Sequence, residues 1–248
     1  MHIHVFFRTF VTMKCEVLVI HVRGQEERRQ FIEQQLKMLN AHYHFILNGN
    51  IEDLTDEILN RFFDGDMHGG YPRTSCAYKH LLAMQYMIDH HLDHALVVED
   101  DLRFYRNFQT IFEQSIRECT EHYDDQPFIV NYEESSLLLV PRSQRRKGTI
   151  VYPAPRDRFA GCYYLNLRAA NAIMDYVTTH HSDTTSDRLH SHLVDLGILN
   201  YYWSHPCIAC QCSCDGSMPT MIPTRPRPLK RLKWFYKRVY KHLLYYLR

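Results

Sequence analysis

Residues 95–101 have the sequence Ala-Leu-Val-Val-Glu-Asp-Asp, a short apolar run that ends in three consecutive carboxylates. A β-branched, apolar run of this length is typical of a strand buried inside a sheet. Ligands of α/β sheets gather at the carboxyl ends of strands, so Glu99, Asp100 and Asp101 are expected at a binding site. The alternative is a solvated turn in which Asp100 or Asp101 caps the following segment.

Strands and helices alternate on both sides of this run. Short apolar segments predict further strands at 16–22, 43–47, 128–131, 136–140 and 162–165. Helical spacing of apolar residues predicts helices at 26–39, 51–63, 75–91, 107–119, 168–177 and 187–196. This alternation predicts an α/β/α sandwich around a mostly parallel central sheet.

The length and composition are those of a folded enzyme-sized domain. The 248 residues, 45% of them hydrophobic, can form one catalytic domain with a sizeable core, which we place at residues 13–222. Residues 1–12 are interpreted as an upstream extension, because Met13 directly before the first strand would be a natural start. No apolar stretch approaches the roughly 20 residues of a membrane span, and no signal-peptide cleavage site is recognisable.

The eight cysteines are interpreted as free thiols of a reducing compartment, which predicts a cytoplasmic protein. Four of them crowd into residues 207–214, as Cys207, Cys210, Cys212 and Cys214. Structural zinc normally takes two separated ligand pairs, and four ligands this close would strain a tetrahedron. Reduced structural thiols are therefore favoured over a zinc site, which stays open as the alternative.

The acidic trio has the chemistry of a site for Mn²⁺ or Mg²⁺. Hard carboxylate oxygens suit either ion, which can bridge the protein to a diphosphate and stabilise charge on a departing nucleoside diphosphate. Side chains alternate along an extended chain, so Glu99 and Asp101 are expected on one side and Asp100 on the other. We expect Asp101 as a direct ligand, Glu99 as a ligand or water-mediated support, and Asp100 near a ribose.

Several blocks along the chain resemble glycosyltransferase family 25, which includes lipopolysaccharide-building and collagen galactosyltransferases. They are VLVIHVRGQEERRQFI at 17–32, the helix and acidic motif at 75–105, AGCYYLNLRAANAIM at 160–174, a late Asp at 187 and a Pro-x-x-x-x-Gln element at 206–211. The paired arginines, the Cys and His of a Gly-Cys-x-x-Ser-His helix, and the acidic trio all match; these residues are Arg28, Arg29, Cys76, His80 and 99–101. Three positions depart from the pattern, with His21 for a usual Asn, Ser75 for a Gly and Lys79 for a Ser.

The resemblance implies a GT-A-like Rossmann-type fold, Mn²⁺ dependence and inversion at the anomeric carbon of a UDP-sugar, with UDP-galactose the first choice. It further implies a lipid-linked or oligosaccharide acceptor in bacterial lipopolysaccharide or other surface-polysaccharide synthesis. Arg28 and Arg29 are expected at the donor phosphates, since guanidinium groups bind phosphate well, and His80 is expected to face the donor. The alternatives are a solvated helix face for the arginines and a packed core histidine for His80.

An inverting transfer also needs a base that deprotonates the acceptor hydroxyl as it attacks. Asp187, at the start of a predicted helix, is the first candidate, and Glu133 and Glu134 are the alternatives. The competing interpretation is that Asp187 only caps its helix.

The tail at 223–248 differs from the rest of the chain. Nine of the 29 Lys and Arg residues fall within 225–248, which has no Asp or Glu, so the preceding residues carry a net charge of about −8. On a helical wheel the apolar residues, Phe235 among them, oppose a basic side; that side holds Lys230, Lys233, Lys237 and Lys241. Such a helix suits an anionic membrane surface, with Trp234 and Phe235 among its membrane contacts.

This tail predicts a peripheral protein on the inner face of the membrane. Packing of the apolar side on the acidic body is the alternative. No nucleic-acid partner is predicted, because a second basic element and a recognised nucleic-acid motif are lacking.

Two other function classes compete with a glycosyltransferase. A metal-dependent phosphohydrolase or nucleotidyltransferase should have a second acidic cluster for a two-metal site, for which Asp64 and Asp66 are the near candidates. A degenerate, non-catalytic membrane adaptor is the other class, and the departures at His21, Ser75 and Lys79 keep it open.

Overall fold

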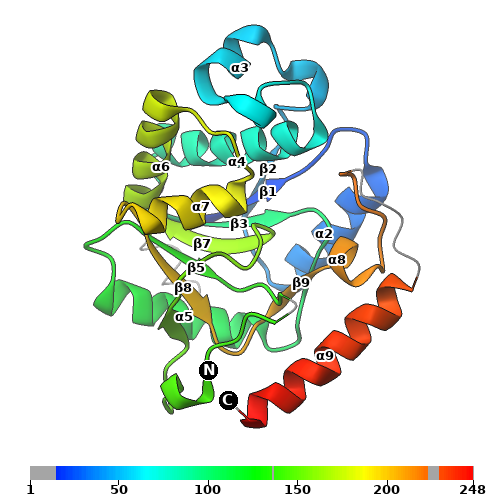
Figure 1. Ribbon diagram of the computed structural model, residues 1–248, viewed down its shortest axis with the longest axis vertical. Coiled ribbons are helices and arrows are strands. Elements are labelled where there is room, and N and C mark those ends of the chain that lie inside the picture. The colour runs from blue at the N-terminus through cyan, green and yellow to red at the C-terminus, as the bar shows by residue number, and fades with distance from the viewer. Residues whose placement is uncertain (1–14, 136, 223–228, 248) are drawn as a thin grey trace.

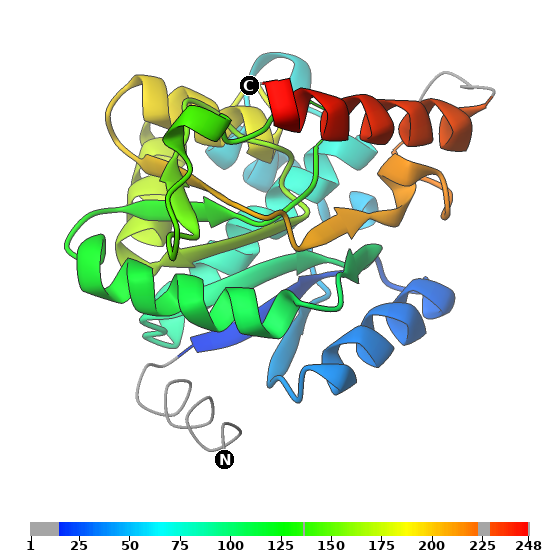
Figure 2. The same cartoon turned by 90° about the horizontal axis from the view of Figure 1, so that it is seen from below.

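A seven-stranded sheet forms the centre of the computed structural model, which describes residues 15–135, 137–222 and 229–247. The strands lie in the order β2-β1-β3-β7-β5-β8-β6, and helices cover both faces (Figure 1; Figure 2). The extension expected at residues 1–12 lies outside the described residues.

Five of the seven strands described in this sheet run in one direction, so the predicted mostly parallel sheet is confirmed. The parallel set is β1 (Cys15–Ile20), β2 (Tyr43–Ile46), β3 (His94–Glu99), β5 (Phe128–Asn131) and β8 (Asn200–Ser204). Two strands run the other way, β7 (Cys162–Asn166) between β3 and β5, and β6 (Val151–Pro153) beside β8. A separate antiparallel pair consists of β4 (Leu102–Phe104) and β9 (Ala209–Gln211).

The helices make the two outer layers of the predicted sandwich. One face of the sheet carries α2 (Glu26–Met38) and α5 (Phe108–His122). The other face carries α4 (Pro72–Asp89), α6 (Leu167–His180) and α7 (Ser186–Asp195), with α3 (Asp56–Phe62) beyond them. Short helical turns are η1 (Ile51–Asp53), η2 (Gly65–Met67), η3 (Arg142–Gln144) and α8 (Cys212–Asp215), and α9 (Lys230–Leu247) runs along one side of the molecule.

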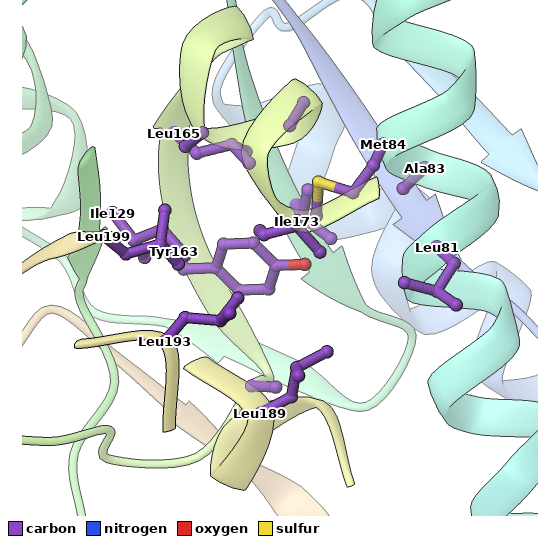
Figure 3. Packing of buried hydrophobic residues seen from close by; sticks show 14 of the residues in the cluster. Leu81, Ala83, Met84, Ile129, Tyr163, Leu165, Ile173, Leu189, Leu193 and Leu199 are labelled. Carbon is purple, nitrogen blue, oxygen red and sulfur yellow. The ribbon is translucent and has the colours of Figure 1, made fainter. Parts of the chain in front are cut away.

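The sheet separates two apolar cores. Alternation along β1 directs Leu18 to the core under α4 and α6 and Val17 to the core under α2 and α5. Tyr163 of β7 is fully buried in the first core, surrounded by leucines and by Met84 and Ile173 (Figure 3). These cores make the sheet a rigid base for the loops at its ends.

Two predicted elements differ from the structure. The helix expected at 51–63 is broken into η1 and α3, because the Asp53 carboxylate accepts from the Gly49 and Asn50 amides and Thr55 caps α3. The strand expected at 136–140 is wrong for 137–140, which form no strand, and Ser136 lies outside the described residues. None of the described helices combines the length and hydropathy that a membrane crossing requires.

One buried histidine makes a prediction about acid stability. His190 of α7 is enclosed by Tyr163 and Tyr201, and burial lowers its pKa from 6.5 to about 3. The folded protein holds this imidazole neutral, whereas the unfolded chain protonates it below pH 6.5. Its contribution to stability is therefore complete above pH 6.5 and is lost as the pH falls from there towards about 3.

We expect the free energy of unfolding of His190→Asn, measured by urea denaturation, to fall less between pH 7 and pH 4 than that of the wild type. The other titrating groups are common to both proteins and cancel in the difference. Parallel pH profiles for the two proteins would contradict this assignment.

Candidate active site

A cleft of about 400 Å³ opens at the carboxyl ends of β1 and β3. Its other walls come from α2, the loop after β2, the first half of α4, residues 159–160, the start of α7, and residues of β9, α8 and the segment that follows α8. Six of the residues predicted from the sequence line it, namely Arg28, His80, Glu99, Asp100, Asp101 and Asp187. The fold thus brings together residues that lie up to 159 positions apart in the sequence.

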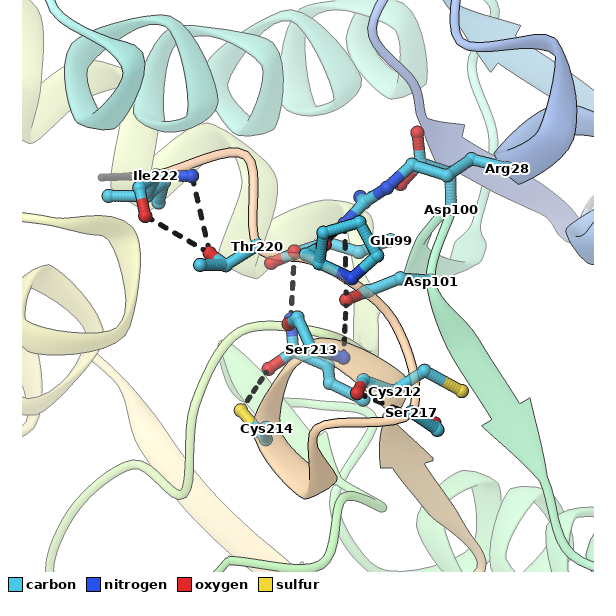
Figure 4. Close-up of polar contacts among 12 residues, drawn as sticks. Arg28, Glu99, Asp100, Asp101, Cys212, Ser213, Cys214, Ser217, Thr220 and Ile222 are labelled. Carbon is cyan, nitrogen blue, oxygen red and sulfur yellow. Dashed lines mark hydrogen bonds and ion pairs between the residues drawn. The ribbon is translucent and has the colours of Figure 1, made fainter. Parts of the chain in front are cut away.

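Backbone hydrogen bonds hold the acidic trio in place. The Glu99 amide donates to the Gly161 carbonyl at 2.9 Å, and the Asp100 amide donates to the Ile20 carbonyl at 3.1 Å. The backbone of residues 99 and 100 therefore stays hydrogen-bonded on both sides, to β1 and to the residue that precedes β7. The three carboxylates thus project from a backbone that is held in place (Figure 4).

Asp101 is a buried carboxylate with one free oxygen. Its Oδ2 accepts from the Ser213 amide at 3.0 Å, while no described group hydrogen-bonds its Oδ1. Burial and then the negative charge of Glu99 raise the pKa of Asp101 to about 6. An unpaired oxygen beside a second carboxylate fits a divalent cation, because a cation would relieve both the burial and the repulsion.

Asp100 is neutralised by the protein itself. Its Oδ2 pairs with His21 Nδ1 at 2.8 Å and its Oδ1 accepts from Arg28 Nη1 at 2.5 Å. The Arg28 Nη2 donates to the Pro219 carbonyl at 2.8 Å and lies 3.6 Å from Asp101 Oδ2. Contact between Asp100 and a ribose therefore requires one of these partners to move, and Arg28 also ties the segment after α8 to the cleft.

The Glu99 carboxylate lies between the side-chain amide of Gln211 and the imidazole of His80. Its Oε2 accepts from Gln211 Nε2 at 2.8 Å, and its Oε1 lies 3.7 Å from His80 Nε2. A Cβ on Gly161 would lie 2.6 Å from the Gln211 side chain, so only glycine lets Gln211 reach this carboxylate. The Nδ1 of His80 hydrogen-bonds Tyr163 OH at 2.9 Å.

The three base candidates lie in different surroundings. Asp187 lines the cleft from the first turn of α7, and its Oδ1 accepts from the Thr185 hydroxyl and from the Arg188 amide at 3.0 Å. Glu133 is fully buried and absent from the cleft wall; its Oε2 accepts from the Gly161 amide at 2.9 Å. Burial and then Glu99 raise the pKa of Glu133 well above its ordinary value.

Glu134 faces away from the cleft, although it follows Glu133 directly. It accepts from the Tyr105 hydroxyl, and its Oε1 lies 3.5 Å from Lys241 Nζ. Of the three base candidates only Asp187 lines the cleft, whereas Glu133 lies in the interior and Glu134 lies against α9.

Arg29 lies outside the cleft. Its guanidinium packs over the Phe45 ring at 5.0 Å, bonds Glu33 at 3.1 Å and is absent from the cleft wall. The side chain is 41% exposed, which fits the alternative of a solvated helix face.

Ser75 and Lys79, two of the residues that differ from the family pattern, hydrogen-bond the backbone of a neighbouring loop. Ser75 Oγ donates to the Gly49 carbonyl at 2.7 Å, and Lys79 Nζ donates to the carbonyls of Leu47 and Asn48 at 3.0 and 2.9 Å. Burial lowers the pKa of Lys79 to about 8. Both side chains tie the loop after β2 to α4, at the edge of the cleft. The residues of this loop, Asn50 and Ile51 included, were not recognised as cleft residues from the sequence.

The tail helix contacts the body through cations. Lys241 is buried and donates to the Ser135 carbonyl at 3.0 Å, Arg238 Nε lies 3.8 Å from Glu134 Oε1, and Arg231 Nε donates to the Gly216 carbonyl at 3.0 Å. Lys241, predicted to lie on the membrane side of the helix, thus lies against the body, where Glu134 attracts it.

The apolar side of α9 points away from the body. Its residues are 42–63% exposed, namely Leu232, Phe235, Tyr236, Val239 and Leu243. The described residues of this side therefore do not pack on the body, which was the alternative considered from the sequence. Lys233 and Lys237 are exposed, Trp234 is half-buried, and the side chain of Lys230 lies outside the described residues.

Two other metal hypotheses lose their support. Neither Asp64 nor Asp66 lines the cleft, so the second acidic cluster that a two-metal phosphohydrolase should have is not at this site. Cys212 Sγ accepts from Arg103 and Cys214 Sγ contacts Gln211 Oε1. Among the described side chains, the metal-binding types converge at Cys76, His80 and Glu99 and not within the cysteines of 207–214.

A comparison with protein families settles what kind of protein this cleft belongs to. The sequence profile of glycosyltransferase family 25 (LPS biosynthesis protein) matches residues 14–189, which is most of the chain. The chain belongs to glycosyltransferase family 25. It is therefore a glycosyltransferase, and the resemblance found in its sequence blocks is confirmed. A comparison with curated proteins finds no match.

Solved structures with similar folds share little sequence. A glycosyltransferase involved in the glycosylation of the major capsid of PBCV-1 is 8% identical, with a TM-score of 0.44, and the match covers 79% of this chain and 93% of that one. The inositol-1-phosphate CTP transferase of T. maritima is 9% identical, with a TM-score of 0.38, and the match covers 90% of this chain and 77% of that one. Mouse xyloside xylosyltransferase 1 in its apo form is 12% identical, with a TM-score of 0.37, and the match covers 75% of this chain and 83% of that one. At these scores the family assignment rests on the sequence profile alone.

The geometry predicts that Glu134 serves the tail helix and not the reaction. Glu134→Gln leaves Lys241 buried without its partner charge, which should weaken the docking of α9 by about 1–3 kcal/mol. We expect faster amide hydrogen exchange in α9, with turnover of a nucleotide-sugar donor within twofold of wild type. Lost turnover with unchanged exchange in α9 would show that Glu134 acts in the cleft after all.

Proposed function

We propose that this glycosyltransferase is metal-dependent and inverting. In this proposal it moves a sugar, galactose as the first choice, from a UDP-sugar to a glycan acceptor of lipopolysaccharide or another surface polysaccharide. The observation that carries the proposal is the pair of Glu99 and buried Asp101 in the cleft wall, with the Asp101 Oδ1 unpaired.

Asp101 and Glu99 would hold the Mn²⁺ or Mg²⁺. When bound, the ion supplies positive charge that stabilises the departing diphosphate. Arg28, 3.6 Å from Asp101, adds a guanidinium on the same side of the cleft, where phosphate oxygens would lie. The cleft also has apolar wall residues, Val22, Ile51 and Pro72, which suit the flat face of a nucleoside.

Asp187 is proposed as the base. Thr185 and the Arg188 amide fix one carboxylate oxygen, so the orientation of the group is set before an acceptor arrives. In the transfer, the carboxylate accepts the proton of the acceptor hydroxyl as the hydroxyl oxygen attacks the anomeric carbon. Attack from the side opposite the leaving diphosphate inverts that carbon.

The tail helix is proposed to bind an anionic membrane surface on the cytoplasmic face. Its exposed apolar residues stand beside Lys233 and Lys237, and residues 225–248 hold no acidic side chain to oppose lipid head groups. This position would place the cleft beside a lipid-linked acceptor.

Asp101→Asn removes the charge that attracts the cation while keeping the size of the side chain. We expect metal-dependent hydrolysis of UDP-galactose to fall by about 10²-fold or more, since a metal contributes several kcal/mol to such a reaction. Asp125→Asn is the matched control, because Asp125 is exposed and outside the cleft wall. Equal activity of the two variants would refute the metal assignment, and hydrolysis of simple phosphate esters without preference for UDP-sugars would favour a phosphohydrolase.

Asp187→Asn tests the base separately from donor binding. We expect kcat for transfer to fall by roughly 10²–10⁴-fold, while the KM for the donor stays within a few-fold of wild type. Steady-state kinetics with varied donor and fixed acceptor measures both. A rise in KM with kcat preserved would mean that Asp187 only helps to bind the donor.

Phe235→Ser combined with Val239→Ser tests the membrane proposal. Each removed side chain should cost about 1.5–3 kcal/mol of insertion, so binding to vesicles with anionic lipid should weaken by about 10²-fold or more. Met38→Ser is the control, because Met38 of α2 is 71% exposed and far from the tail in sequence. Vesicle sedimentation measures the binding, and equal binding of all three proteins would exclude α9 as the membrane contact.

A further inference from the structure

Two side chains of the cleft have no task in the reaction proposed above. Cys76 and His80 stand one helical turn apart on α4, so both project from the same face of that helix. Both line the cleft, and both face the end of β3 at Glu99. Their ligand atoms and the nearer Glu99 oxygen all lie within 4.8 Å of one another.

The imidazole of His80 is prepared for a ligand. The residue is only 2% exposed, and its Nε2 has no hydrogen-bond partner among the described residues. Its other nitrogen, Nδ1, is held by Tyr163 OH at 2.9 Å. A metal-bound histidine usually has its second nitrogen held in this way, because that bond fixes the ring and leaves the other nitrogen as the ligand.

We propose that Cys76, His80 and Glu99 form a site for a thiophilic divalent cation, Zn²⁺ above all. A sulfur, a nitrogen and an oxygen are the ligand types that Zn²⁺ prefers, and three protein ligands leave its fourth position to water from the cleft. Bond lengths of about 2.0–2.3 Å place the ligands of a zinc tetrahedron roughly 3.3–3.7 Å apart. The His80 Nε2 to Glu99 Oε1 separation is 3.7 Å, so little movement is needed.

The thiol makes this site chemically different from the carboxylate pair of Glu99 and Asp101. Oxygen ligands alone suit Mn²⁺ and Mg²⁺, whereas a thiolate selects softer ions; the thiol proton is released to solvent when the ion binds. Glu99 belongs to both sets. Insofar as the proposed function holds, Zn²⁺ at the thiolate site would therefore withdraw Glu99 from the catalytic ion and inhibit transfer.

Cobalt substitution tests the ligand set without any assay of activity. Co²⁺ bound to a thiolate shows a charge-transfer absorption in the near ultraviolet, which oxygen and nitrogen ligands alone do not give. We expect the wild type titrated with Co²⁺, under reducing conditions and without nucleotide, to show this absorption and to lose it when Zn²⁺ is added.

Cys76→Ser should abolish the absorption, whereas Cys214→Ser, which changes another thiol of the same cleft wall, should keep it. Absence of the absorption in the wild type, or its survival in Cys76→Ser, would overturn the proposal. His80→Gln gives a second test should the serine variant fold poorly, because loss of the nitrogen ligand should shift the absorption and weaken Co²⁺ binding. Unchanged absorption and affinity in folded His80→Gln would equally overturn it.

Asp101→Asn separates this proposal from the proposed function. Asp101 is not one of the three converging ligands, so the variant should keep the Co²⁺–thiolate absorption while losing Mn²⁺-dependent turnover. Turnover that survives would count against the proposed catalytic ion alone, and absorption that disappears would count against the thiolate site alone.

Discussion

Negative charge at the carboxyl end of β3 is the constraint around which the site is built. Three carboxylates leave one short stretch of backbone held between β1 and β7, and two of them, Asp100 and Asp101, are at least 97% buried. The protein itself pairs both carboxylate oxygens of Asp100, one with His21 and the other with Arg28. Asp101 keeps an unpaired oxygen beside Glu99. Arg28, whose Nη2 lies 3.6 Å from Asp101 Oδ2, is shared with Asp100, so the cation proposed at Asp101 and Glu99 would offset the negative charge that remains.

The end of β3 was predictable from local sequence because all of its signals lie within seven residues. An apolar β-branched run followed by carboxylates defines both the buried strand and its polar end. What completes the site comes from far along the chain, and although Gln211 ends the Pro-x-x-x-x-Gln element, nothing in the local sequence indicates that it holds Glu99. The Ser213 amide that holds Asp101 and the Gln211 amide that holds Glu99 are each 112 positions away. Position 161 must be glycine because a Cβ there would collide with the Gln211 side chain. This need becomes visible only once β7 and β9 are placed in the fold.

The limits of sequence patterns are clearest where neighbours point in opposite directions. Glu133 and Glu134 both looked suitable as a base, yet one is enclosed beside Gly161 and the other pairs with the tail helix. Both residues lie beyond β5, which ends at Asn131, so the alternation of a strand could not assign their directions from the sequence. The amphipathic helix at the tail was likewise predictable, whereas its orientation was not. Electrostatic attraction to Glu134 turns Lys241 inward and holds the half-exposed Arg238 near the body, which leaves Phe235 and Val239 outside.

The most direct measurement of the cation site is anomalous diffraction from a crystal of the protein containing Mn²⁺ and UDP. We predict a single strong manganese peak within coordination distance of Asp101 Oδ1, bridging to the pyrophosphate oxygens of UDP. A pyrophosphate bound in the cleft with no manganese beside Asp101, or manganese only at another place on the molecule, would contradict the account.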